Sequence, residues 1–180
     1  MRRTRNKNQL LIIVLAVGFF IGIVYENIVS KGGNGSVSIF SKDYLKGYVE
    51  FNIATEKYLW HVVKTRFVLL AILFLLSYFK WKKLFVLISV WLCGFFAGVM
   101  TVGAILQLGM KGILFCLVAL LPHGVFYIMA YTILFVYWYR YPEIRWNRAK
   151  ISFVMLMFVV GITTEVYLNP MFVKWMIRGL

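Results

Sequence analysis

The segment that decides the fold is residues 84–139, LFVLISVWLCGFFAGVMTVGAILQLGMKGILFCLVALLPHGVFYIMAYTILFVYWY. It is almost wholly apolar, Lys111 is its one charged residue, and Leu121-Pro122-His123-Gly124 interrupts it. A helix rises about 1.5 Å per residue and the hydrocarbon core of a bilayer is about 30 Å thick, so this segment is too long for one crossing. We therefore expect it to fold back on itself in a membrane, with the rest of the chain packed against it.

The composition is that of an integral membrane protein. The 180 residues are 62% hydrophobic and 14% charged, whereas a soluble domain is about half apolar and a quarter charged. In a soluble chain the net charge of +14 would suggest nucleic-acid binding, but no helix-turn-helix, zinc or RNA-binding pattern accompanies it. The cations instead indicate cytoplasmic loops in contact with membrane lipid, and we expect no nucleic-acid partner.

The expected fold is all-α, a bundle of about five transmembrane helices. A basic cytoplasmic N-terminus, residues 1–9, precedes a signal-anchor helix at 10–29, which we expect to be retained because no small-x-small cleavage site follows it. Residues 30–65 form an external loop, whose apolar residues recur at the spacing of an amphipathic helix. Residues 66–180 complete the transmembrane bundle, with crossings expected at 67–79, 84–108, 122–139 and 151–168.

The cations orient these crossings. They gather before the first crossing, at residues 80–83 and at residues 140–150. Loops rich in Lys and Arg stay in the cytoplasm. The sequence therefore predicts a multi-pass protein with a cytoplasmic N-terminus, an external amphipathic segment and an external C-terminus.

Small residues stand at helical spacing in two of the expected crossings. Such spacing produces a smooth helix face on which a second helix can pack closely. We expect these residues to pack helices rather than to bind a ligand: Gly18, Gly22, Gly94, Gly98 and Thr101.

Pro122, His123 and Gly124 form a polar interruption that allows two geometries. One is a single kinked helix across the membrane; the other is a half-length helix at 112–121, after which Pro122 begins the true crossing. Proline suits the first turn of a helix and Gly124 permits a bend, which favours the broken form slightly. We expect His123 to hydrogen-bond backbone groups that Pro122 frees. A single histidine without further ligands at suitable spacing does not predict a metal site.

Glu165 is the other ionisable residue expected inside a late crossing, close to Asn169 and Pro170, which should end that crossing. A structural polar clamp is favoured over a proton relay, because a relay normally links several carboxylates. The candidate partners for Glu165 are Asn27, Gln107, Lys111 and His123. No GxSxG, HExxH, paired carboxylate or phosphate-binding loop occurs, so we predict no enzyme, no catalytic residue, no cofactor and no metal.

Four motifs occur in an order that resembles the stage II sporulation protein M family: Gly94-Phe95-Phe96-Ala97-Gly98, Gly109-Met110-Lys111-Gly112, Leu121-Pro122-His123-Gly124 and Glu165-Val166-Tyr167-Leu168-Asn169-Pro170. The resemblance covers roughly residue 84 to the C-terminus, together with the signal anchor.

This resemblance implies a non-enzymatic scaffold of a bacterial cell membrane that works in engulfment during endospore formation. It also implies assembly with membrane-anchored cell-wall hydrolases, the stage II sporulation proteins D and P. The alternative is a small transporter or permease subunit that uses the interruption at Pro122 with His123 and Glu165, because broken helices with polar groups often line substrate paths.

Overall fold

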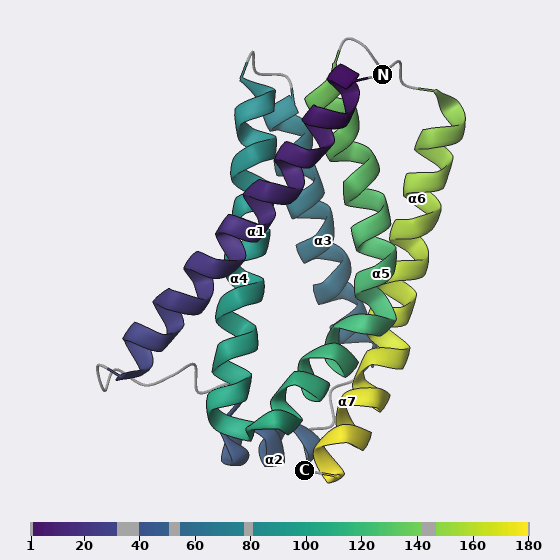
Figure 1. Cartoon of the computed structure of the whole chain (residues 1–180). Coiled ribbons are helices and arrows are strands. Elements are labelled where there is room, and N and C mark those ends of the chain that lie inside the picture. The colour runs from purple at the N-terminus through teal and green to yellow at the C-terminus, as the bar shows by residue number, and fades with distance from the viewer. Residues whose placement is uncertain (1, 32–39, 51–54, 78–80, 142–146, 180) are drawn as a thin grey trace. The chain divides into compact units, whose positions relative to one another are not determined.

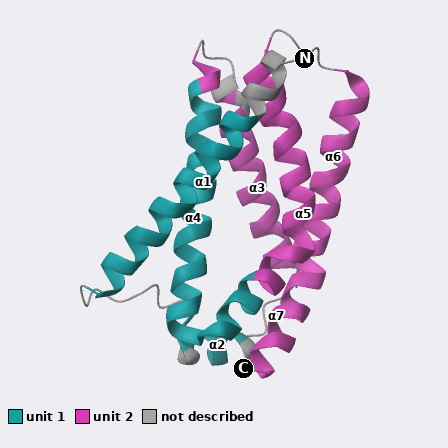
Figure 2. Ribbon diagram, viewed as in Figure 1, with its two compact units in different colours: residues 1–48, 84–116 teal, residues 49–83, 117–180 magenta. Residues whose placement is uncertain are grey.

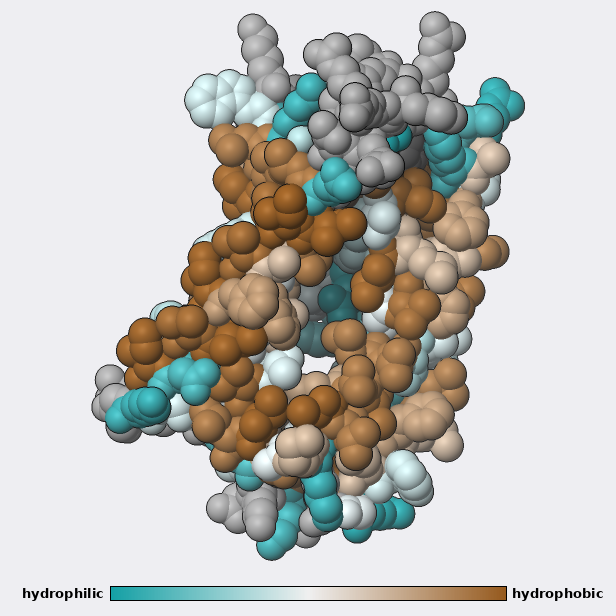
Figure 3. All heavy atoms as spheres, in the orientation of Figure 1, coloured by the Kyte–Doolittle hydropathy of each residue, from teal (hydrophilic) through white to brown (hydrophobic). Residues whose placement is uncertain are grey.

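The computed structural model describes residues 2–31, 40–50, 55–77, 81–141 and 147–179, and within these ranges all regular structure is helical (Figure 1). Four helical stretches are long and apolar enough to cross a membrane. Apolar side chains cover much of their outer surface (Figure 3), as contact with lipid requires. The expectation of an all-α, multi-pass membrane protein is confirmed at this level. The four stretches are Gln9–Lys31, Lys82–Leu108, Met110–Arg140 and Arg148–Arg178.

The chain divides into two compact units (Figure 2). Unit 1 contains Met1–Tyr48 and Leu84–Cys116, and unit 2 contains Val49–Lys83 and Leu117–Leu180. The division falls inside helix α5 (Met110–Arg140), which begins in unit 1 and continues into unit 2.

In unit 1, helices α1 (Arg2–Lys31) and α4 (Lys82–Leu108) touch through glycines. A Cβ atom at Gly22 would overlap the carbonyl oxygen of Phe95, and one at Gly98 would overlap that of Phe19. The same holds one turn earlier on each helix, and the contacts advance along both helices in the same order, so α1 and α4 run parallel. The predicted packing residues on the two helices are thus partners: Gly18, Gly22, Gly94 and Gly98.

Thr101, the fifth predicted packing residue, uses its hydroxyl within its own helix. Its Oγ1 donates to the carbonyl of Ala97 at 2.7 Å, which is how a threonine satisfies its hydroxyl in an apolar helix. Beyond Gly98, α4 also faces α1 at Gly103, where a Cβ would lie 3.5 Å from Oε1 of Glu26.

Helix α2 (Lys42–Glu50) is the amphipathic helix expected in the external loop. Leu45 and the preceding Phe40 are 6% and 5% exposed, and the Phe40 ring meets Phe115 edge-on at 6.1 Å. Burial raises the pKa of Tyr48 above its usual value, and Tyr44 adds to the shift. The α2 segment is therefore packed on unit 1 instead of projecting freely.

The loop expected at residues 30–65 is shorter in the structure, because helix α3 (Thr55–Ser77) begins at Thr55 and includes the end of that range. Glu56 lies in its first turn, where a negative charge is favourable to the helix dipole. The expected crossing at 67–79 forms the C-terminal part of α3, apart from residues 78–79, which lie outside the described residues. Residues 32–39 and 51–54 of the expected loop also lie outside them.

A glycine turn joins α4 to α5, within the motif Gly109-Met110-Lys111-Gly112. Gly109 has φ +63°, a left-handed conformation that favours glycine, and its N–H donates to Ile105 O at 2.8 Å. Gly112 lets the first turn of α5 approach the backbone of Ala104, where a Cβ would overlap the carbonyl oxygen.

Two expected interruptions differ in the structure. Helix α5 is continuous across Pro122. The last crossing does not end at Asn169 and Pro170: helix α6 (Arg148–Thr163) continues through a π-helical turn, η2 (Thr164–Leu168), into α7 (Asn169–Arg178). Pro170 stands at the start of α7, where no backbone N–H is needed, and the N–H of Asn169 reaches back to Thr164 O.

Candidate functional site

The main polar cluster of unit 2 is an ion pair between α3 and η2. Arg66 donates from Nη2 to Glu165 Oε1 at 2.6 Å and from Nε to Glu165 Oε2 at 3.0 Å. The Arg66 and Glu165 side chains are 29% and 11% exposed. Two parallel charge-assisted bonds fix both the distance and the orientation of the two groups.

Tyr127 of α5 completes the cluster. Its hydroxyl donates to Glu165 Oε2 at 2.7 Å, and the guanidinium carbon of Arg66 lies 4.7 Å from the centroid of the Tyr127 ring. We call Arg66, Tyr127 and Glu165 the polar clamp. Its members come from α3, α5 and η2, so the polar clamp joins three helical segments of unit 2.

Gly161 sets the position of the Tyr127 ring. A Cβ at Gly161 would lie 2.9 Å from a ring carbon of Tyr127, closer than side chains normally approach. The ring also meets Phe158, which lies on the same helix α6, at a centroid distance of 5.7 Å. The ring therefore lies along α6, and its hydroxyl reaches the carboxylate of Glu165 one helical turn further on.

The π-helical turn carries the carboxylate. Thr164–Leu168 form η2, in which Glu165 and Val166 are buried. A π turn inserts one extra residue into a helix, and such turns often occur at functional sites. Thr164 donates its hydroxyl to the carbonyls of Val160 and Gly161 at 3.0 and 2.9 Å, which satisfies polar groups on the approach to this turn.

His123 lies beside the polar clamp, but its Nδ1 atom makes no hydrogen bond to the clamp residues. Its ring is 6.0 Å from that of Tyr127, in an edge-on arrangement. Among the described residues, Nδ1 of His123 is buried and has no hydrogen-bond partner, so the bond expected to backbone freed by Pro122 is absent at this atom. Gly124 is buried, and a Cβ there would meet the Leu120 side chain of the same helix at 3.0 Å.

The sequence selected Glu165 but not its partners. Of the four candidates, Asn27 donates to Ile23 O in its own helix at 2.8 Å, and the polar clamp instead uses Arg66 and Tyr127. Arg66 stands one residue before the predicted crossing at 67–79. A cation at that position was the one feature of the sequence that could have indicated a partner for Glu165. The Oδ1 atom of Asn169 is buried without a hydrogen-bond partner among the described residues, so this atom makes no hydrogen bond to the polar clamp.

A second carboxylate is buried in unit 1. Glu26 of α1 is 2% exposed, and its Oε1 has no hydrogen-bond partner among the described residues. The Glu26 carboxylate faces α4, where a Cβ at Gly103 would lie 3.5 Å from Oε1. In the described parts of the chain no group of three or more His, Cys, Asp or Glu residues is arranged to hold a metal ion.

The fold and this site define an all-helical membrane protein with buried polar residues inside its bundle units. Comparison with protein-family models, with curated proteins and with solved structures gives no match.

Proposed function

We propose that this protein is a non-enzymatic membrane scaffold and that the polar clamp holds unit 2 in one arrangement. The observation that carries the proposal is the complete engagement of Glu165: both carboxylate oxygens accept hydrogen bonds from fixed partners, one of them a permanent cation. A carboxylate held in this way is stabilised in its charged form and is poorly placed to carry a proton or to act as a base.

The arrangement of α1 and α4 supports five crossings. Two parallel helices that both cross a bilayer need a return crossing between them, and α3 is the long helix in that interval. With 23 residues, α3 reaches about 34 Å, enough for the hydrocarbon core. Arg66 would then lie in or near the bilayer, where its pairing with Glu165 offsets the cost of a buried charge. We also propose that α5 makes one crossing with a bend at Pro122.

The two basic loops of unit 2 share one end. Lys82, which follows the α3–α4 connection, places its Nζ 3.2 Å from the centroid of the Tyr141 ring, which ends α5. In unit 2, α7 ends at the opposite end (Figure 2). With the basic loops in the cytoplasm and five alternating crossings, we expect the C-terminus, α2 and the α4–α5 turn on the external side.

The order of the motifs resembles that of the stage II sporulation protein M family, and on this basis we propose that the scaffold acts in engulfment during endospore formation. Its partners would be the stage II sporulation proteins D and P. Those partners degrade peptidoglycan outside the membrane, and the proposed external surfaces are α2, the α4–α5 turn and α7. A chain with little mass outside the bilayer and a rigid bundle suits the task of holding other membrane proteins in position.

The test is crosslinking and purification of the tagged full-length protein from membranes of sporulating cells that express it. Recovery of the two hydrolases, and loss of their localisation at the engulfing membrane when the gene is deleted, would support the scaffold. Recovery of the protein alone, with normal engulfment in the deletion strain, would reject it. The variant Lys111→Gln changes an exposed side chain in the first turn of α5. Loss of hydrolase recovery with unchanged thermal unfolding of this variant would separate partner binding from folding.

A small transporter is the second candidate, and one observation favours it. His123 is a polar residue expected inside the bilayer whose Nδ1 is buried without a partner, and it lies next to the polar clamp and the π turn. Reconstitution in vesicles tests this reading: a solute flux that His123→Ala abolishes, with unchanged thermal stability, would favour transport over the scaffold.

A further inference from the structure

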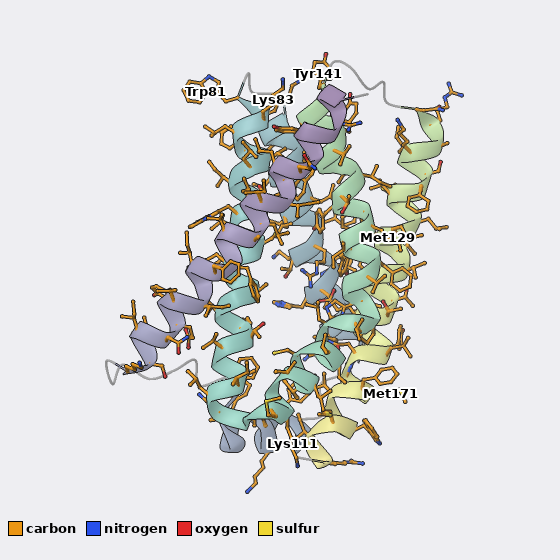
Figure 4. All side chains as sticks on the ribbon, viewed as in Figure 1. Trp81, Lys83, Lys111, Met129, Tyr141 and Met171 are labelled. Carbon is orange, nitrogen blue, oxygen red and sulfur yellow. The ribbon has the colours of Figure 1, made fainter. Side chains whose placement is uncertain are left out.

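One end of unit 2 combines cations with exposed aromatic rings. We call this surface the basic end; in Figure 4 its labelled members Trp81, Lys83 and Tyr141 lie close together. Glu143 and Arg145 also belong to this part of the sequence, outside the described residues. The described residues of the basic end include no acidic side chain, and they are Trp81, Lys82, Lys83, Arg140, Tyr141, Arg148 and Lys150.

A cation–π contact organises the basic end. The Lys82 ammonium lies over the Tyr141 ring at 3.2 Å from its centroid, so the start of α4 meets the residue that follows α5. The contact holds the Lys82 side chain in place and leaves Lys83 exposed beside it. Trp81 is 69% exposed and Tyr141 is 44% exposed. Amphipathic rings with this exposure are typical of the layer where lipid headgroups meet hydrocarbon.

Among the described residues, the first turns of the helices at this end carry cations and no carboxylate. Helices α4 and α6 both begin at this end, and neither carries an acidic residue in its first turn. Lys82, Lys83, Arg148 and Lys150 occupy those first turns, where the helix dipole adds to their charge instead of opposing it. A fixed group of like charges is stabilised when an anion binds among them.

We propose that the basic end is a binding surface for the phosphate headgroups of anionic phospholipids. The ligand class follows from three features together: clustered cations, exposed rings at the same level, and apolar helix surface directly beside them, including Leu84 at 45% exposure. A nucleic acid or an acidic protein would use the cations, but only a lipid would also cover the exposed apolar helix surface beside them. This binding surface is independent of the scaffold role proposed above.

The experiment is native mass spectrometry of the full-length protein in detergent, titrated with phosphatidylglycerol or with phosphatidylcholine. We expect selective retention of phosphatidylglycerol. Each cation near a membrane surface contributes about 1 kcal/mol, so Lys82→Gln with Lys83→Gln should weaken retention roughly 25-fold, about fivefold per cation. Tyr141→Leu should weaken it less, and Tyr141→Phe should preserve it, because the phenylalanine ring keeps the cation–π contact.

The matched control is Lys174→Gln with Arg178→Gln, which removes the same charge from the opposite end of unit 2. Unchanged phosphatidylglycerol retention in this control supports the proposal, whereas equal losses in both double variants overturn it. Inorganic phosphate separates the sources of the anion: displacement of the lipid by millimolar phosphate would overturn recognition of a phospholipid. Selective retention of an acidic protein in place of lipid would overturn it as well. Thermal unfolding of every variant confirms that the fold is kept.

Discussion

Arg66 on α3 donates two hydrogen bonds to Glu165 in η2, which lies 99 residues further along the chain. This contact ties the early part of unit 2 to its last helix. Burying two paired charges in a membrane protein costs desolvation free energy, and burying one charge without its partner costs far more. The pair therefore makes unit 2 sensitive to the loss of either partner and less sensitive to the loss of both.

Glu165→Gln should destabilise unit 2 strongly, because it leaves the Arg66 guanidinium partly buried without its counter-ion. The expected loss is about 3 kcal/mol in the free energy of unfolding. Thermal or chemical unfolding of the full-length protein in one detergent measures it.

The control is a double-mutant cycle with Arg66→Gln. The double variant should be more stable than either single variant, since it leaves no unpaired charge. Additive losses in the cycle would contradict a direct energetic link between the two residues.

Tyr127→Phe should cost about 1.5 kcal/mol, because it removes one hydrogen bond to a charged acceptor and keeps the ring. Tyr167→Phe is the matched control, since Tyr167 is 53% exposed and lies two residues from the same carboxylate. Equal stability of Tyr127→Phe and the control would show that the hydroxyl does not stabilise the polar clamp.

Gly161→Ala should destabilise the protein by about 1–3 kcal/mol, although alanine normally favours a helix, because the added Cβ would press on the Tyr127 ring. Gly47→Ala is the comparison: no atom lies within 4 Å of its Cβ position in α2, so alanine should be neutral or stabilising there. The same unfolding assay ranks the two variants, and a stabilising Gly161→Ala would refute the described ring position.

Gly98→Ala should separate α1 from α4. Its Cβ would overlap a backbone carbonyl of α1, which cannot move aside as a side chain can, and we expect a loss of about 3 kcal/mol. Gly103→Ala, on the same helix, would meet only ordinary contacts and should change stability little. A disulfide-trapping pair on α1 and α4 would report the separation directly, and equal behaviour of the two alanine variants would contradict the close packing.

The topology has its own test in labelling of single cysteines, in a background where Cys93 and Cys116 are replaced. Ser41→Cys and Gly179→Cys should react with an impermeant reagent added to intact cells, because both positions are expected outside. Asn147→Cys should react only after the membrane is opened. Labelling of Gly179→Cys only in opened cells would reject five crossings.

The sequence predicted several features that depend on short-range chemistry. The membrane class follows from long apolar segments, and the return of the chain within residues 84–139 follows from their length. Other expectations failed for equally local reasons. A proline can stand in the first turn of a helix, so Pro170 begins α7 instead of ending the helical stretch.

The partners of Glu165 could not be predicted, because Arg66 and Tyr127 become its neighbours only when three helical segments pack together. Likewise the glycines of α1 and α4 each indicated a packing face, but their pairing depends on two helices meeting in parallel.

Hydrophobic length and glycine spacing are carried by consecutive residues, so the sequence by itself determined that this chain is helical, belongs in a membrane and has faces for close packing. Which side chains meet across those helices was decided only by the tertiary structure. Long-range contacts depend on the rotation and register of each helix, and a nearly uniform apolar sequence does not specify either.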